Sequence, residues 1–209
     1  MPNAVKPLIY FISDGSIDDQ NYHIKLAQLL QLLSEAVSAN IPFAQLREKQ
    51  LSPRRLLDLE RRAVSVTRGS RTKLLINDRF DVALAAGADG VHLTSTSVRA
   101  DVIRGSVSPG FVIGVSTHSI DEVRQAADTG ADLIVFGPVF DTPSKGVSVG
   151  LEALSDAVRG AGDVPVLALG GIDRGNYHDV LARGAAGFAA IRFLNDLQNL
   201  ARLRAEFNL

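Results

Sequence analysis

Positively charged residues and glycines follow several short apolar runs of this chain, and their types suit the binding of an anion. They are Arg47 and Lys49, Lys145, the pair Gly170-Gly171, and Arg192. An arginine side chain offers paired hydrogen bonds to a phosphate or carboxylate, and glycine lets backbone amides approach an anion closely. Four cationic side chains gathered at one site would suit a substrate with more than one anionic group.

Each of these residues also has a plainer interpretation. Arg47 and Lys49 fit an ordinary solvated strand end, and Gly170-Gly171 fits a tight turn. Arg192 fits a salt bridge to Asp196, about one helical turn further along the chain. The anion site is therefore a prediction that depends on where the fold places these residues.

Eight apolar runs have the length and composition of buried strands. They span residues 8–12, 42–46, 73–76, 90–93, 111–115, 133–136, 164–169 and 188–191. Amphipathic windows at 24–39, 54–67, 120–128, 151–159 and 177–183 lie between them and have helical spacing. Three of the runs follow a glycine-alanine pair, at Gly87, Gly130 and Gly184, and glycine is typical just past a helix. The repeated strand–helix unit predicts a closed (β/α)₈ barrel, with a doubly wound open sheet as the competing fold.

The composition sets the outer limits of function. The 209 residues fit one barrel domain, 1–209, and no apolar run reaches the length of a membrane span. There are no cysteines, which excludes disulfides and thiolate metal sites. The net charge of −1 gives no basic surface for nucleic acid. Residues 1–7 lack the apolar core of a signal peptide. We expect a cytoplasmic protein with no nucleic-acid or membrane partner, whose assembly into a homo-oligomer is left open.

Six motifs resemble those of the thiamine-phosphate synthase and TenI family, in the family's order and from about Leu8 to the C-terminus. They are Gln45-Leu46-Arg47-Glu48-Lys49, Ile76-Asn77-Asp78-Arg79, Gly90-Val91-His92-Leu93, the stretch Ile113 to His118, the stretch Gly137 to Lys145, and Ala168-Leu169-Gly170-Gly171-Ile172. The resemblance implies a (β/α)₈ barrel and a small phosphorylated thiazole or pyrimidine ligand.

One branch of the family, the synthases, joins a pyrimidine diphosphate to a thiazole phosphate carboxylate with the help of magnesium. The resemblance implies two acidic metal ligands, and Asp78 matches the first. The second position falls on Ser97, in a run without a carboxylate. Magnesium prefers oxygen ligands and usually one or two carboxylates, so this departure weakens the synthase interpretation. Asp78 would otherwise serve as a cap for a helix that begins near Arg79.

The TenI branch resembles thiazole tautomerases, which move a proton on the thiazole ring and lack the second acid. The resemblance implies a histidine base, and His118 occupies that position. Histidine suits the role because its unperturbed pKa lies near neutrality. The alternative for His118 is a neighbour of the N-cap of a helix that begins near Ser119. His92 lies inside a strand pattern and is expected to be a packed, hydrogen-bonded core residue.

We therefore expect a TenI-like thiazole tautomerase that works without a metal through His118. The alternatives are a magnesium-dependent synthase with an altered metal site at Asp78, and a non-catalytic relative that binds a phosphate ester. Arg192 departs from the small residue that the family usually has there, and it would either clamp the anion or select a different one. The expected substrate-binding residues are Arg47, Lys49, Asn77, Ser116, Thr142, Ser144, Lys145, Gly170, Gly171, Ile191 and Arg192.

Overall fold

The computed structural model describes residues 6–142, 147–207 and 209. Within them, eight parallel strands form a closed barrel in which each strand pairs with its neighbours in sequence order and β1 pairs with β8. The strands are β1 (Leu8–Ile12), β2 (Phe43–Leu46), β3 (Lys73–Asn77), β4 (Gly90–Leu93), β5 (Val112–Thr117), β6 (Leu133–Phe136), β7 (Val166–Ala168) and β8 (Gly187–Ala190). The predicted (β/α)₈ barrel is confirmed, and the open sheet is wrong.

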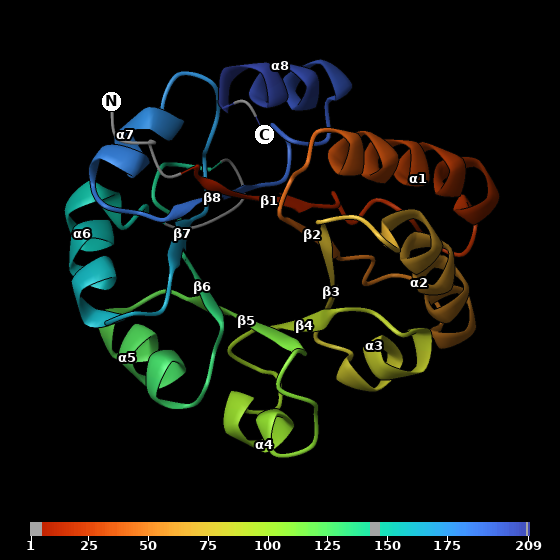
Figure 1. Cartoon of the computed structure of the whole chain (residues 1–209), viewed down its shortest axis with the longest axis horizontal. Helices are drawn as coiled ribbons and strands as arrows, with labels where there is room; N and C mark the ends of the chain where they lie inside the picture. Colours follow the sequence, from red (N-terminus) through yellow and green to blue (C-terminus); the bar gives the residue numbers. More distant parts are fainter. Residues whose placement is uncertain (1–5, 143–146, 208) are drawn as a thin grey trace.

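In the described part of the chain, one helix follows each strand, and these eight helices form an outer ring around the barrel (Figure 1). They are α1 (Tyr22–Ser38), α2 (Pro53–Thr67), α3 (Phe80–Ala86), α4 (Ala100–Arg104), α5 (Ile120–Asp128), α6 (Gly150–Gly160), α7 (Tyr177–Ala182) and α8 (Leu197–Phe207). The three predicted glycines after helices all have positive φ: 74° at Gly87, 90° at Gly130 and 89° at Gly184. Glycine adopts this conformation without steric cost, which is why it ends helices here.

Two layers of apolar side chains hold the barrel together. Side chains that point outward from the strands pack against the helices, and a second cluster fills the barrel itself. The inner cluster consists of Tyr10, Ile12, Leu75, Leu133, Val135, Leu167 and Ala189. This alternation is the expected pattern for barrel strands, and it explains why their sequences are apolar on both faces.

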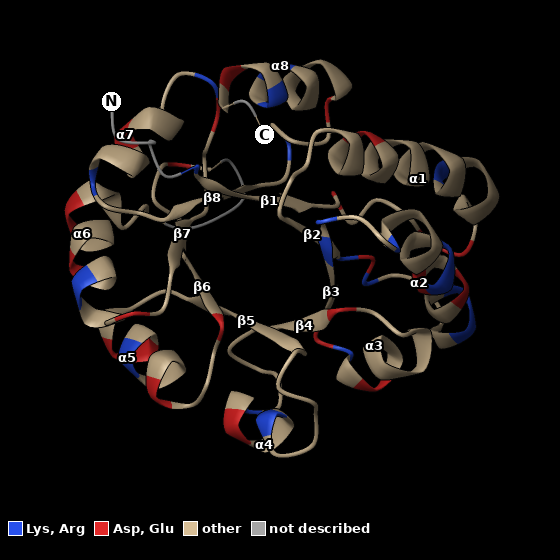
Figure 2. Ribbon diagram, viewed as in Figure 1, with Lys and Arg blue, Asp and Glu red and all other residues tan. Residues whose placement is uncertain are grey.

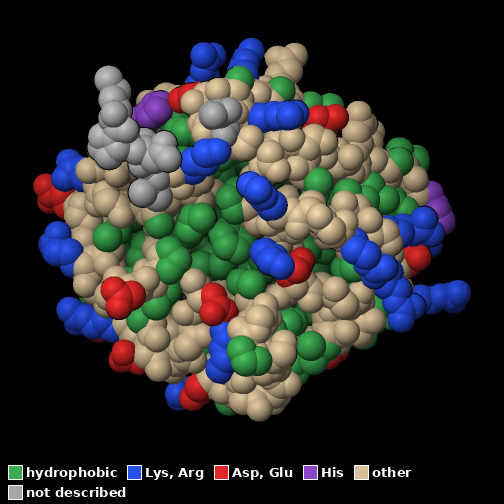
Figure 3. Space-filling view, viewed as in Figure 1, with side chains coloured by type: hydrophobic (Ala, Val, Ile, Leu, Met, Phe, Trp, Pro, Cys, Tyr) green, Lys and Arg blue, Asp and Glu red, His purple; other side chains and the backbone are tan. Residues whose placement is uncertain are grey.

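Charged residues lie mainly on the outer helices and the loops, while the strands carry few (Figure 2). Apolar side chains gather over the centre of the barrel on the face seen in Figure 3, and most charged ones surround them. No helix in the described part of the chain is long and apolar enough to cross a membrane.

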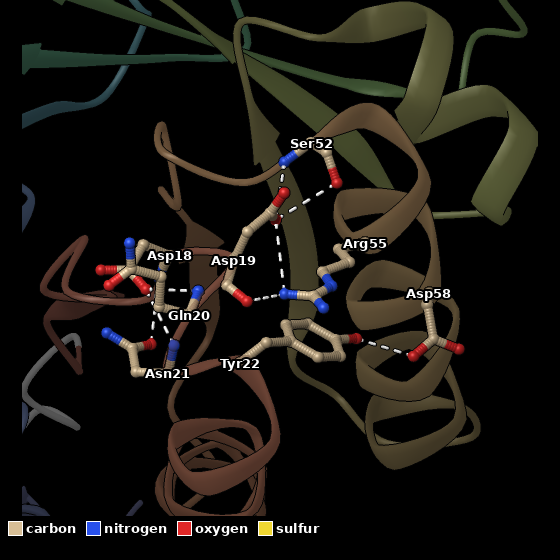
Figure 4. A network of polar contacts seen from close by, with 8 residues as sticks. All are labelled: Asp18, Asp19, Gln20, Asn21, Tyr22, Ser52, Arg55 and Asp58. Carbon is tan, nitrogen blue, oxygen red and sulfur yellow. Dashed lines mark hydrogen bonds and ion pairs between the residues drawn. The ribbon is translucent and has the colours of Figure 1, made fainter.

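The loop between β1 and α1 is tied to α2 by polar contacts (Figure 4). Asp19 Oδ1 accepts hydrogen bonds from the backbone N–H and the hydroxyl of Ser52, at 3.1 and 3.2 Å, and Arg55 donates to the Asp19 carbonyl. At the start of α1, the Tyr22 hydroxyl donates to Asp58 Oδ2 at 2.7 Å. These contacts fix one of the loops at the carboxyl ends of the strands.

Candidate functional site

The predicted site residues that the structure describes lie at or just beyond the carboxyl ends of strands. Arg47 and Lys49 follow β2, Asn77 ends β3, Ser116 lies in β5 and His118 follows it, and the remaining ones follow β3, β6, β7 and β8. Because all eight strands are parallel in one closed barrel, these positions share one end of it. Ser144 and Lys145 lie outside the described residues. The closed topology thus brings together residues that the sequence spaces over more than 140 positions.

A first cavity of about 350 Å³, here called the glycine cavity, brings both predicted arginines together. Its lining consists of Asp14, Arg47, Thr142, residues 169–172 and residues 189–192. Among the described residues, neither Arg47 nor Arg192 takes part in an ion pair. The Thr142 hydroxyl oxygen is buried and has no hydrogen-bond partner there. Two cations, a hydroxyl without a partner among the described residues and a glycine backbone are suitable elements for binding an anion.

The salt bridge considered for Arg192 is not formed. Asp196 Oδ1 instead accepts the backbone N–H groups of Gln198 and Asn199, at 2.8 and 3.0 Å, at the start of α8. This carboxylate is engaged as a helix cap, which leaves the exposed Arg192 side chain available to the cavity.

The glycine pair of this cavity has a steric requirement beyond a plain turn. Gly170 and Gly171 have φ values of 101° and 64°. A Cβ at Gly170 would lie 2.5 Å from Pro138 Cα, and one at Gly171 would lie 2.7 Å from Phe140 Cβ. The loop after β6 is held against them, because the Phe140 N–H donates to the Gly170 carbonyl at 3.1 Å. α7 begins only at Tyr177 and has six residues, so backbone packing rather than a helix dipole characterises this turn.

A second cavity, of about 290 Å³ and here called the Asp78 cavity, lies beside β2, β3 and β4. Its polar lining consists of Glu48, Lys49, Asn77, Asp78, Arg79, Thr94 and Thr96. Asp78 has a positive φ of 63°, a conformation that aspartate tolerates better than most residues. Its Oδ1 accepts a hydrogen bond from the Ser97 hydroxyl at 2.6 Å, and Ser97 Oγ accepts the Thr94 N–H at 2.8 Å.

Asp78 is not the helix cap that one interpretation assigned to it. The N-cap of α3 is Arg79, and its side chain accepts no hydrogen bond from the first turn of the helix. Asp78 contributes its backbone carbonyl to Phe80 N–H, at 2.9 Å, while its carboxylate faces Ser97. Asp78 and Ser97, the two positions that the resemblance matches to metal ligands, are thus in direct contact, and one of them carries a hydroxyl rather than a carboxylate.

The donor set around Asp78 does not supply an acidic pair for magnesium. One Asp78 oxygen already accepts the Ser97 hydroxyl, and the two basic residues Lys49 and Arg79 line the same cavity. Glu48, the other acid there, is 3% exposed and accepts N–H groups of Gly15 and Ile17, at 3.3 and 2.9 Å. A dication would meet one partly engaged carboxylate among cations, which is a poor fit.

Glu48 holds the β1–α1 loop, a role that the sequence did not suggest. Besides its two backbone partners, it faces Ser13, whose Oγ accepts the Arg47 N–H at 2.8 Å. Burial raises the pKa of Glu48, although its hydrogen bonds from Ser13 and Ile17 oppose that change. The signal available in the sequence was only its place between two site residues.

His118 is oriented by two hydrogen bonds at the carboxyl ends of β5 and β6. Its Nδ1 lies 2.5 Å from the Gly137 carbonyl oxygen, and its backbone N–H donates to Glu122 Oε2 at 2.5 Å. A carbonyl only accepts, so Nδ1 carries the hydrogen and the lone pair of the neutral ring lies on Nε2. Ser119 is the N-cap of α5, as the alternative interpretation expected, and its hydroxyl accepts the Glu122 N–H at 3.3 Å. His118 is exposed and lines neither of the two cavities formed by described residues above.

His92 is a buried, hydrogen-bonded core residue, which confirms the prediction for it. It is 2% exposed and contacts the Tyr10 hydroxyl and the Ser116 hydroxyl. Burial, and to a smaller degree the positive charge of Arg47, lowers the pKa of His92 to about 3. The ring is therefore neutral at physiological pH.

Ser116 and Asn77 each receive a buried partner at the mouth of the barrel. Ser116 also lines a third cavity of about 220 Å³, the Ser116 cavity, between β4, β5, α4 and α5, with Thr94, Ser97 and Glu122. Asn77 Oδ1 accepts a hydrogen bond from Gln45 Nε2 at 3.0 Å. Gln45 Oε1 is buried and has no partner among the described residues. Gln45 thus lies at the site, although the sequence analysis gave it only as part of a motif and named Arg47 and Lys49 as the site residues.

Comparison with known proteins gives a consistent family. A family model described as thiamine monophosphate synthase matches residues 9–194. A putative thiamine-phosphate synthase of Geobacter sulfurreducens is 45% identical over 166 residues, which cover 78% of this chain and 78% of the relative. The thiamine-phosphate synthase of Methanoregula boonei is 38% identical over 186 residues, 88% of this chain and 83% of the relative. The solved thiamine phosphate pyrophosphorylase of Pyrococcus furiosus is 29% identical, with a TM-score of 0.78 and 98% of both chains covered.

Proposed function

This chain belongs to the thiamine-phosphate synthase and TenI family, and we propose that within it the chain is a TenI-like thiazole tautomerase. It binds a thiazole phosphate carboxylate at the carboxyl end of the barrel and moves a proton on the thiazole ring. The observation that carries the proposal is the hydrogen bond between Ser97 and Asp78, the two positions where the resemblance implies an acidic metal pair in a synthase.

The glycine cavity supports binding of the phosphate group. Its two arginines, which form no ion pair with any described residue, and the backbone at Gly170-Gly171 line the same space. A substrate that carries a phosphate and a carboxylate matches two guanidinium groups in charge. Lys49, Asn77, Ser116 and Ile191 are proposed to contact the rest of the ligand, and Thr142 its phosphate.

His118 supports the proton transfer. The Gly137 carbonyl holds its Nδ1–H, so Nε2 is the atom that accepts a proton from the thiazole and then delivers a proton at another position. The proton on Nε2 exchanges with solvent between the two steps, so the product gains deuterium in D₂O. Because one proton leaves the substrate and one returns, the net charge is unchanged and the step needs no metal. Glu122, which binds the His118 backbone N–H, keeps the start of α5 and this residue in place.

The second candidate is a thiamine-phosphate synthase, a transferase that joins a pyrimidine diphosphate to the thiazole phosphate with magnesium. The names of the relatives favour it, since those at 38–45% identity carry the synthase name, in one case as putative. The Asn77-Asp78-Arg79 motif is also retained. Against it stands the single carboxylate at Asp78, which contributes half the charge that a paired acidic site would offer a metal beside diphosphate.

One experiment separates the two reactions and a non-catalytic binder. The purified protein is given thiazole phosphate carboxylate in D₂O with a chelator, and isomer conversion and deuterium uptake are followed by NMR. A parallel sample receives the pyrimidine diphosphate and magnesium and is assayed for thiamine phosphate. We expect conversion in the first and little product in the second. Robust magnesium-dependent coupling would establish the synthase, and ligand binding with neither reaction would indicate a non-catalytic relative.

A further inference from the structure

Three side chains from β1, β4 and β5 form a hydrogen-bonded chain across the interior of the barrel. Tyr10 Oη lies 3.1 Å from His92 Nδ1, and His92 Nε2 lies 2.8 Å from Ser116 Oγ. Tyr10 is 0% exposed and His92 is 2% exposed, whereas Ser116 is half-buried near the end of its strand. A Cβ at Gly114 would lie 2.8 Å from His92 Nδ1, so glycine makes room for the imidazole. The hydrogen-bonded chain therefore leads from the core to the mouth of the barrel.

The buried Tyr10 end of this hydrogen-bonded chain determines which atom donates in each of its hydrogen bonds. Within the described part of the protein, the Tyr10 hydroxyl has no hydrogen-bond partner other than His92 Nδ1. If Nδ1 carried a hydrogen and donated it to Tyr10, the phenolic O–H would be buried without an acceptor. An unsatisfied buried donor costs about 1–3 kcal/mol, so the favoured arrangement has Tyr10 donating to Nδ1.

The hydrogen bond from Tyr10 also determines how the His92 ring interacts with Ser116. A neutral imidazole with an acceptor Nδ1 carries its hydrogen on Nε2, which donates to Ser116 Oγ. The Ser116 hydroxyl hydrogen therefore cannot point at His92, and no other acceptor for it exists among the described residues. It remains for a molecule that enters the mouth of the barrel.

We propose that Tyr10 and His92 are positioning residues that fix the polarity of the Ser116 hydroxyl, so that Ser116 acts as a hydrogen-bond donor to the ligand. The ligand must then present an acceptor at this point, such as a ring nitrogen or a carboxylate oxygen, and a ligand with an N–H there is disfavoured. This selection rests on the proposed function only in placing a thiazole phosphate carboxylate at the mouth. The state of His92 itself is independent of that function.

The tautomer of His92 can be read by NMR without any ligand. Two-bond ¹⁵N–¹H correlations of the imidazole rings distinguish protonated from bare nitrogens, and the spectrum of His92→Gln assigns the signals. We expect Nε2 protonated and Nδ1 bare in the wild type, from pH 6 to pH 9. In Tyr10→Phe the contact that favours this tautomer is gone, and a share of the Nδ1–H form should appear. A wild-type His92 with its hydrogen on Nδ1 would overturn the proposal.

Calorimetry with thiazole phosphate carboxylate tests the consequence for binding. Ser116→Ala should raise the Kd roughly 2- to 12-fold, the value of one neutral hydrogen bond. Tyr10→Phe should raise it by a smaller factor, and should add nothing in the Ser116→Ala background because both changes act through one hydroxyl. Independent, additive losses of affinity in the two variants would contradict the proposed hydrogen-bonded chain from Tyr10 to Ser116.

A matched control removes a tyrosine hydroxyl elsewhere. The Tyr177 hydroxyl donates to Glu206 at 2.5 Å, on the outside of the barrel. Tyr177→Phe should leave both the His92 spectrum and the Kd unchanged. If the wild type binds no thiazole compound but shows the expected His92 tautomer, the proposed substrate is wrong and the polarity of Ser116 stands. The reverse result would retain the substrate and reject the polarity.

Discussion

At the scale of single residues, the proposed chemistry depends on which atom of His118 is free. The Gly137 carbonyl fixes the hydrogen on Nδ1, so Nε2 alone can act as base. His118→Asn should lower the rate of proton transfer about 10²- to 10⁴-fold, because the amide keeps a polar contact but cannot take a proton. Deuterium uptake into the thiazole measures the rate, and calorimetry should show little change in Kd. His178, exposed and paired with Glu206, supplies the control His178→Asn. Equal losses in both variants would remove His118 from the mechanism.

Ser97 decides whether a metal has a place at this barrel. Ser97→Asp puts a second carboxylate beside Asp78, where the hydroxyl now lies at 2.6 Å. Two like charges at this distance repel, and magnesium relieves that repulsion, so the variant should be stabilised by magnesium more than the wild type. Thermal unfolding with and without the ion measures the difference, and the coupling assay reports any gain of synthase activity. Ser95→Asp, two positions away, is the control. A wild type stabilised by magnesium as much as the variant would contradict the prediction.

Arg192 is predicted to be a direct ligand contact. It shares the glycine cavity with Arg47 and pairs with no carboxylate within the described residues. Arg192→Ala should weaken binding of the phosphorylated thiazole by about 1.5–3 kcal/mol, the range for a hydrogen bond to a charged group. Calorimetry provides the Kd, and Arg202→Ala on the exposed side of α8 is the matched charge control. An unchanged Kd in Arg192→Ala would leave the residue without a role at the cavity.

The sequence predicted residue types well but not their partners. Arg47, Asp78 and His118 were found because they follow strands. The resemblance already paired Asp78 with Ser97, 19 positions away, but not the hydrogen bond between them. The partner that orients His118 was hidden for a physical reason, because the Gly137 group is a backbone carbonyl. No pattern of side chains marks a carbonyl. The roles of all predicted site residues remain predictions, and Ser144 and Lys145 lie outside the described residues.

At the scale of elements, the apolar runs predicted where the strands lie. The observed ends of some strands differ from the predicted ones for local chemical reasons. β7 spans three residues rather than the predicted six, and Pro165, just before it, has no N–H to donate to the ladder. α4 was not predicted because it has only five residues, too few for a periodic pattern. α8 also lay outside the predicted windows, although its Leu200 and Leu203 are buried at helical spacing.

The second helix contains a destabilising acid that makes stability depend on pH. Glu60 is 0% exposed, and neither of its oxygens has a hydrogen-bond partner among the described residues. Burial raises its pKa from 4.5 to about 8. The folded protein therefore holds the proton more tightly than the unfolded chain. The stabilisation that the folded protein gains from this tighter proton binding is complete below about pH 4.5. It is lost as the pH rises toward 8, because Glu60 must then ionise while it is buried.

Glu60→Met keeps the side-chain volume at this buried position and removes the ionisable carboxyl group. Its advantage over the wild type in free energy of unfolding should grow between pH 4.5 and pH 8 and reach about 2–4 kcal/mol. Urea unfolding at both pH values measures it. The exposed Glu35→Met on α1 should show no such growth. Parallel pH profiles for wild type and Glu60→Met would mean that Glu60 ionises inside the folded protein at no cost.

At the scale of the whole molecule, closure of the sheet turns scattered sequence motifs into one site. The β1–β8 seam brings the loops after the last strands beside those after the first, which is why Asp14 and Arg192 line one cavity. An open sheet would have separated them. A single domain, a cytoplasmic location and the absence of nucleic-acid and membrane partners remain predictions from composition, and assembly into a homo-oligomer remains open.

Closure itself depends on a residue without a side chain. At the seam, a Cβ on Gly187 would lie 1.8 Å from the Leu8 carbonyl oxygen, and backbone on both sides cannot yield without breaking strand pairs. Gly187→Ala should therefore lower the free energy of unfolding by about 3 kcal/mol or more, or prevent folding. Gly105→Ala, where the nearest atom would be 3.6 Å away, is the matched control and should change it by less than about 1 kcal/mol. Urea unfolding followed by circular dichroism compares the two. Equal stability would mean that the β1–β8 pairing can be widened at Gly187 without loss of folding free energy.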